Sequence, residues 1–178
     1  MIPNLLSIFR MTAFLPVIIF FSFEYYLTSF FLFSAAAWSD LLDGFLARKY
    51  NLTSNIGSLL DLLADKILVS SILIFFVFYS VNLYLMILTT LIIIREISIS
   101  SLRLFLVSNG ANISAITPDK YGKLKTFLQM FSLSLLLISP LFGNIFFKIV
   151  LILLLISTIF SLLTFINYTN IWRAIKKE

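Results

Sequence analysis

Four aspartates lie close together in an otherwise apolar part of the sequence. They are Asp40, Asp43, Asp61 and Asp65, and they make up half of the acidic residues of the chain. A charged side chain near the centre of a membrane helix costs roughly 2.5 to 3.5 kcal/mol, so four uncompensated carboxylates would cost on the order of 10 kcal/mol. The neighbouring bases Arg48 and Lys66 are too few to balance them. Bound cations are therefore expected.

The spacing of these aspartates suits paired metal ions. Asp40 and Asp43 are three residues apart, and Asp61 and Asp65 are four apart, so each pair shares one face of a helix. The short connection between the two helices predicts antiparallel neighbours whose carboxylates converge. Oxygen-only ligands suit Mg²⁺, Mn²⁺ or Ca²⁺ rather than zinc. Two divalent cations would balance the four charges, and such pairs commonly serve phosphoryl transfer.

The residue types that are missing restrict the chemistry. The chain has no Cys and no His, which excludes disulfides, thiolate nucleophiles and histidine bases. Any acid, base or ligand must be a carboxylate, a lysine or a neutral oxygen. The net charge is +5, but the basic residues are dispersed between apolar runs. Anionic lipid and phosphate are therefore expected partners, and nucleic acid is not.

The composition predicts a membrane protein. Hydrophobic residues make up 61% of the chain, charged residues 12%, and the mean hydropathy is +1.08. Soluble domains are less apolar. A helix needs roughly 20 apolar residues to cross the hydrocarbon, so the length allows about six spans. The apolar runs do not alternate as barrel strands do. We expect an all-α, polytopic membrane protein with six transmembrane helices, and residues 1–178 form a single domain.

The boundaries of the spans follow from turn-rich stretches. The predicted spans are Met11–Phe23, Thr28–Tyr50, Gly57–Tyr79, Leu83–Val107, Gly122–Leu141 and Ile145–Trp172. Residues 2–10 mix polar and apolar types, which predicts a short amino-terminal interfacial helix. A cleaved signal peptide is not expected, because the nearest run of small residues, Ala35–Ala37, leads directly into charged residues of another apolar segment.

Basic residues are concentrated at alternate connections. These residues are Arg48, Lys49, Lys120, Lys123, Lys125, Arg173, Lys176 and Lys177, with Arg10 near the start. The intervening turns hold Glu24 and Lys148. By the positive-inside rule, both termini and the aspartates face the cytoplasm of a multi-pass protein in the cytoplasmic (inner) membrane.

The residues around the aspartates follow an ordered pattern, Asp40-x2-Asp43-Gly44-x2-Ala47-Arg48-x8-Gly57-x3-Asp61-x3-Asp65. Every position of the signature of the CDP-alcohol phosphotransferase family is present, so the chain resembles that family. A match of this length at fixed spacing is improbable by chance.

The resemblance implies a fold and a set of roles. It implies six transmembrane helices around a metal site that opens to the cytoplasm. The four aspartates would bind Mg²⁺ or Mn²⁺, and Asp65 would also be the catalytic general base. Gly44 and Arg48 would bind the CDP moiety of a CDP-diacylglycerol donor. Homodimers are common in the family.

The remaining basic residues bear on the acceptor. Arg95, Arg103, Lys123 and Lys125 lie on the fourth and fifth spans and could bind an acceptor that carries phosphate, such as glycerol 3-phosphate. The simpler alternatives are positive-inside anchoring and snorkelling for the lysines, and a pair with Glu96 or another carboxylate for Arg95.

Three short segments carry a narrower resemblance. Residues 2–6 with Arg10, residues 95–97 with Arg103, and residues 122–126 are similar to bacterial phosphatidylglycerophosphate synthases within the family. The expected reaction transfers a phosphatidyl group from CDP-diacylglycerol to glycerol 3-phosphate and releases CMP. The alternatives are another acceptor, namely serine, inositol phosphate or phosphatidylglycerol, and a cation transporter that uses the aspartates as a pathway.

Overall fold

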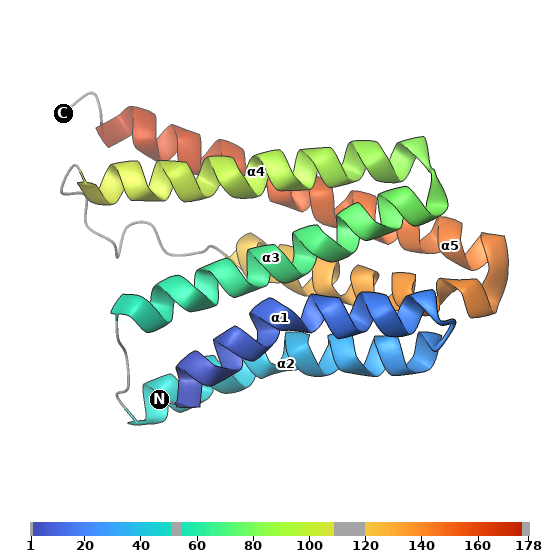
Figure 1. The fold of residues 1–178 in the computed structure, drawn as a ribbon. Helices are drawn as coiled ribbons and strands as arrows, with labels where there is room; N and C mark the ends of the chain where they lie inside the picture. Colours follow the sequence, from blue (N-terminus) through green and yellow to red (C-terminus); the bar gives the residue numbers. More distant parts are fainter. Residues whose placement is uncertain (1, 51–54, 109–119, 176–178) are drawn as a thin grey trace.

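The computed structural model describes the backbone of residues 2–50, 55–108 and 120–175, and the side chains of residues 7–39, 60, 63–102, 105, 122, 124–166 and 169. Within these residues every regular element is a helix (Figure 1). The helices are α1 (Ile2–Ser22), α2 (Tyr26–Tyr50), α3 (Asn55–Ser80), α4 (Leu83–Ser108) and α5 (Lys120–Ile175). The all-α fold class is therefore confirmed.

Helix α5 is a hairpin of two arms. Its backbone leaves helical geometry at Gly143, where φ is 78° and ψ is −172°. Glycine suits this conformation because it has no Cβ to clash. Figure 1 shows α5 running along the bundle and returning beside it. The two arms correspond to the predicted spans 122–141 and 145–172, so the described backbone contains six helical segments of alternating direction.

The other two tight turns contain residues with left-handed backbone. At the end of α1, Glu24 has a φ of 65°, its N–H donates to the carbonyl of Phe21 at 3.0 Å, and that of Tyr25 donates to the carbonyl of Phe20 at 2.9 Å. These two bonds form a Schellman motif. After α3, Val81 has a φ of 46°, and the Asn82 side chain then caps α4 by accepting the N–H of Leu85 at 3.1 Å.

Three stretches of the described residues are long and apolar enough to cross a membrane. They are Leu63–Ser80, Leu83–Leu102 and Leu124–Ile166. The last has 43 residues, which at about 1.5 Å per residue is twice the roughly 30 Å of a hydrocarbon core, as expected for the hairpin. The predicted amino-terminal helix is not separate, because α1 runs without interruption from Ile2 to Ser22. Its apolar part, Ser7–Ser22, is shorter than a typical span.

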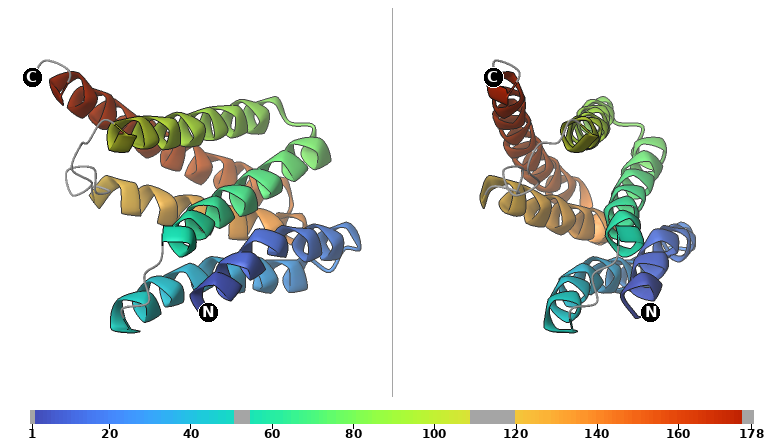
Figure 2. Two further views of the ribbon diagram at one scale, coloured as in Figure 1. Left: turned by 60° about the vertical axis from the view of Figure 1, so that its left-hand side comes forward. Right: turned by 90° about the vertical axis from the view of Figure 1, so that its left-hand side faces the viewer.

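Helix α1 lies between α2 and α3. It packs extensively against both, whereas direct contacts between α2 and α3 are few among the described residues. The two helices that carry the aspartates run antiparallel, as predicted (Figure 1), but they are held together mainly through α1. Helix α4 lies on the far side of α3 and packs against α3 and α5 (Figure 2).

The core is an apolar layer that joins α1, α2, α3, α4 and both arms of α5. Its densest part is an aromatic cluster on α1 and α3. The ring of Phe21 is almost fully buried and meets the rings of Tyr26, Phe75, Phe76 and Tyr79 edge-on, at centroid distances of 4.9 to 5.5 Å. This geometry is favourable for aromatic pairs and fixes α1 on α3 at the end of the bundle that holds the α1–α2 turn.

Candidate active site

The backbone places the four signature aspartates at one end of the bundle. Asp40 and Asp43 lie in the second half of α2, and Asp61 and Asp65 lie in the first half of α3. The end of α2, the start of α3 and the start of α1 lie together at the same end (Figure 1). The side chains of Asp40, Asp43 and Asp61 lie outside the described part. The convergence of all four carboxylates therefore stays a prediction.

Asp65 is bound by an arginine from another helix. The guanidinium of Arg10 on α1 donates through one terminal nitrogen to Oδ1 of Asp65 at 2.8 Å. The Nε of Arg10 donates to the hydroxyl of Ser39 on α2 at 3.4 Å. Arg10 is fully buried, whereas the Asp65 side chain is 30% exposed. One buried cation thus connects α1 with both aspartate-bearing helices.

Lys66 faces a different helix from Asp65. Its ammonium donates to the hydroxyl of Ser100 on α4, which in turn donates to the carbonyl of Glu96 at 2.7 Å. Adjacent helical residues point about 100° apart, which explains why Asp65 meets α1 while Lys66 meets α4. Lys66 is also close enough to interact electrostatically with Glu96 and Lys125.

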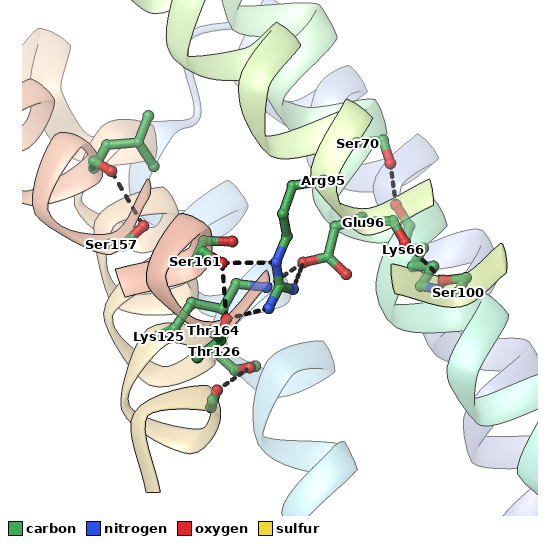
Figure 3. A network of polar contacts seen from close by, with 12 residues as sticks. Lys66, Ser70, Arg95, Glu96, Ser100, Lys125, Thr126, Ser157, Ser161 and Thr164 are labelled. Carbon is green, nitrogen blue, oxygen red and sulfur yellow. Dashed lines mark hydrogen bonds and ion pairs between the residues drawn. The ribbon is translucent and has the colours of Figure 1, made fainter. Parts of the chain in front are cut away.

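Arg95 is the centre of a second buried network (Figure 3). Its Nε donates to the carbonyl of Ser161 at 3.0 Å, and a terminal nitrogen donates to the hydroxyl of Thr164. The other terminal nitrogen pairs with Oε1 of Glu96 at 2.8 Å. Ser161 and Thr164 lie on the second arm of α5, so Arg95 joins that arm to α4.

Lys125 joins the same network from the first arm of α5. Its ammonium pairs with Oε1 of Glu96, the same oxygen that Arg95 binds. Lys125 is 5% exposed and Arg95 is 8% exposed, whereas the Glu96 side chain is 22% exposed. The hydroxyl of Ser161 is buried beside this network and has no hydrogen-bond partner in the described part of the chain.

The predicted acceptor residues thus fall into two groups. Arg95 and Lys125 are brought together around Glu96, and the pair between Arg95 and Glu96 is the alternative that the sequence leaves open. The side chains of Arg103 and Lys123 lie outside the described residues, as do Gly44 and Arg48 of the predicted CDP site. Their roles stay predictions.

The residues present fit a divalent cation by their chemistry. The signature offers carboxylate oxygens without any nitrogen or sulfur ligand, which suits a hard cation. Asp65 is held in place by Arg10, as ligating carboxylates commonly are by a hydrogen-bonded neighbour. Among the described side chains, no three of His, Cys, Asp or Glu lie together. The side chains of three of the four aspartates are not among those described.

Sequence reasoning missed where two residues lie in the bundle. Arg10 counted as an anchoring charge at the membrane surface, and Glu96 counted as a possible partner of Arg95 alone. The useful signal for Arg10 is a single base in the apolar stretch Ser7–Ser22, because a charge there needs a partner inside the bundle. For Glu96 the signal is a rare carboxylate in the fourth span.

Comparison with known proteins identifies the family. The CDP-alcohol phosphatidyltransferase family matches residues 1–168. A protein of Wigglesworthia glossinidia brevipalpis is 37% identical over 97% of this chain and 95% of its own length, and one of Rickettsia bellii is 37% identical over 99% and 96%. A Bacillus subtilis protein is 36% identical over 82% and 74%. All three are named CDP-diacylglycerol--glycerol-3-phosphate 3-phosphatidyltransferase. The chain belongs to the CDP-alcohol phosphatidyltransferase family.

Proposed function

We propose that the chain transfers a phosphatidyl group from CDP-diacylglycerol to glycerol 3-phosphate, giving phosphatidylglycerophosphate and CMP. The observation that carries the proposal is the full-length similarity, near 37% identity, to relatives that bear this one enzyme name. The complete aspartate signature supports it, because every residue that the family chemistry requires is present. The reaction belongs to the synthesis of anionic phospholipid.

The proposed reaction is a single displacement at phosphorus. Asp65 accepts the proton of the acceptor hydroxyl, and the oxygen attacks the phosphorus on the lipid side of the diphosphate. The bond between that phosphorus and the bridging oxygen breaks, and CMP leaves with the electron pair. Gly44 and Arg48 hold the CDP moiety, Arg48 as a charge-assisted donor to the diphosphate.

The four aspartates are proposed to hold two divalent cations, Mg²⁺ or Mn²⁺. The chemistry that such cations supply when bound is stabilisation of the charge that develops on the transferred phosphate. The fit of the ligands supports this assignment, since hard oxygen donors suit both ions. CMP must reach water, so we place the site at the cytoplasmic side of six spans in the inner membrane, with both termini on the same side.

The acceptor pocket is proposed to lie beside the Glu96 network. Lys125 and Arg95 bring positive charge there from two helices, and the Ser161 hydroxyl adds a buried donor. Arg103 and Lys123 are proposed to complete the pocket from the ends of α4 and α5. A phosphate dianion suits such a group of cations better than the zwitterion serine.

The test is CMP release by detergent-purified protein with CDP-diacylglycerol and Mg²⁺ or Mn²⁺. Glycerol 3-phosphate, serine, inositol phosphate and phosphatidylglycerol are compared as acceptors. We expect metal-dependent release with glycerol 3-phosphate alone, and Arg103→Ala should raise its KM. Release with another acceptor would contradict the assignment of the acceptor pocket. If no acceptor gave release, the alternative that the aspartates line a cation-transport pathway would be favoured.

A further inference from the structure

Arg10 occupies a position that neither the signature nor the proposed mechanism explains. It is fully buried on α1 and contacts Ser39 on α2 and Asp65 on α3. We propose that Arg10 is a positioning residue for the reaction: from α1 it fixes the Asp65 carboxylate relative to the aspartates of α2. This inference rests on the proposed function, in which Asp65 is the base and a metal ligand.

The packing of the helices gives Arg10 this role. Because α2 and α3 have few direct contacts, their relative position depends on the helices that pack against both, chiefly α1 and to a smaller extent α5. Apolar contacts such as the aromatic cluster around Phe21 fix α1 to α3 at the opposite end. Toward the aspartate end, the described side chains add the polar bridge through Arg10 to this packing. The spacing of the two aspartate pairs is therefore sensitive to this one residue.

The shape of the guanidinium makes the bridge rigid. Its Nε and one terminal nitrogen lie in a single plane and bond two different helices, at 3.4 Å to Ser39 and 2.8 Å to Asp65. Ser39 directly precedes Asp40 in the chain, and its own hydroxyl donates to the carbonyl of Ala36 at 2.7 Å. A lysine at position 10 would keep the charge, but it offers one point of attachment on a flexible stem.

The expected kinetic effect separates positioning from acceptor binding. A misplacement of about 1 Å can cost on the order of 100-fold in rate. Arg10→Lys should therefore lower kcat by roughly 10- to 100-fold while the KM for glycerol 3-phosphate stays within about twofold. Ser39→Ala removes the contact of Arg10 with α2, together with the hydrogen bond from Ser39 to the Ala36 carbonyl, and should lower kcat by a few-fold. Thr12→Val is the matched control, because Thr12 is on the same helix and its hydroxyl donates to the carbonyls of Ile8 and Phe9 within that helix.

Stability measurements distinguish positioning from a general structural role. Arg10→Met leaves Asp65 without this cation and is expected to lower the thermal unfolding midpoint, so it serves as the destabilised reference. Arg10→Lys should keep a midpoint close to that of the wild type and still lose turnover. A loss of turnover that follows the midpoint across Arg10→Lys, Arg10→Met and Ser39→Ala would overturn the proposal. Wild-type kcat in Arg10→Lys would overturn it too.

The closing experiment needs no acceptor. Mn²⁺ affinity is measured by electron paramagnetic resonance for the wild type, Arg10→Lys, Asp65→Asn and the double variant. We expect Arg10→Lys to weaken Mn²⁺ binding in the wild type and to have no further effect in Asp65→Asn, because it acts through that carboxylate. Additive effects, or no Mn²⁺ binding by the wild type, would overturn the inference.

The two hypotheses fail in different ways. If the effects of Arg10→Lys and Asp65→Asn on Mn²⁺ affinity are not additive, but no CMP is released with glycerol 3-phosphate, the proposed acceptor is contradicted and the role of Arg10 stands. If the two substitutions have additive effects on Mn²⁺ affinity and the wild type releases CMP normally, only the role of Arg10 is contradicted.

Discussion

Arg10 and Arg95 are both buried in this bundle, but they bind different kinds of partner. Arg10 binds a carboxylate of the catalytic signature and a serine on a neighbouring helix. Arg95 binds a carbonyl and a hydroxyl of α5 and the carboxylate of its own neighbour, Glu96. Arg10 joins three helices and directs its charge at the proposed reacting residue, whereas Arg95 joins α4 to the second arm of α5 and directs most of its donors at helix packing.

The difference teaches that burial of an arginine does not by itself indicate ligand binding. Each nitrogen of the Arg95 guanidinium has a protein acceptor, so Arg95 serves the contact between α4 and the second arm of α5. The ammonium of Lys125 donates to the carboxylate of Glu96. A substrate phosphate can take the place of that carboxylate as the acceptor, because both are anionic oxygen groups. Of the two described acceptor candidates, Lys125 is therefore the better placed to contact phosphate.

The largest effect is expected for Asp65→Asn, which changes the carboxylate that Arg10 binds. Removing a general base costs typically 10²- to 10⁴-fold in rate, and we expect a loss of kcat in this range with the protein still inserted. CMP release and membrane fractionation measure the two properties. Glu24→Gln is the control, since Glu24 is a carboxylate at the α1–α2 turn. Near-normal turnover of Asp65→Asn would show that the base is another residue.

At the second arginine, Arg95→Met should act on stability. The substitution removes the donors to the Ser161 carbonyl and the Thr164 hydroxyl, while Glu96 keeps its pair with Lys125, so a cost of about 1 to 3 kcal/mol is expected. We expect a clearly lower unfolding midpoint in detergent, with Thr90→Val as the control on the exposed face of the same helix. An unchanged midpoint with a raised acceptor KM would instead make Arg95 a phosphate ligand and remove the contrast with Lys125.

Lys125→Met should act on acceptor binding. A hydrogen bond to a charged group contributes about 1.5 to 3 kcal/mol, so the KM for glycerol 3-phosphate should rise roughly 10- to 100-fold. We expect kcat to change much less, which initial rates over a range of acceptor concentrations will measure. Lys148→Met is the matched control, because Lys148 is exposed and lies just after the bend at Gly143. Equal effects of the two variants would contradict the pocket.

The smallest effect is expected far from both arginines, for Val81→Gly. Val81 is 87% exposed and has a φ of 46°, a conformation that costs a β-branched residue about 1 to 2 kcal/mol. Glycine relieves this strain but loses more backbone entropy on folding, so a gain below about 1 kcal/mol is expected. The unfolding midpoint should rise slightly at unchanged turnover. A lower unfolding midpoint would show that the backbone at Val81 is not strained.

Much of this architecture is predictable from sequence because the signals are local. Apolar runs give the helices, and turn residues give boundaries that agree with the structure to within a few residues at α2, α3 and α4. The aspartate signature gives the family. The single-domain organisation, the membrane orientation and the assembly into homodimers stay predictions.

What the sequence could not give is which helices touch. The connection between α2 and α3 suggested direct neighbours, but α1 lies between them, because helix packing depends on side-chain shape over the whole bundle. For the same reason the partners of Arg10 and Arg95, 55 and 66 to 69 residues away, could not be deduced from spacing.

The position of Glu96 directly after Arg95 has a consequence for membrane insertion. Helix α4 is synthesised before α5, so Arg95 meets the bilayer before Ser161 and Thr164 have been made. Glu96 lies on the same helix, and its carboxylate already pairs with Arg95, which reduces the charge that the helix carries into the lipid. Lys125 arrives next, and the second arm then supplies the last two acceptors. We therefore expect these contacts to form in the order in which their residues follow one another along the chain.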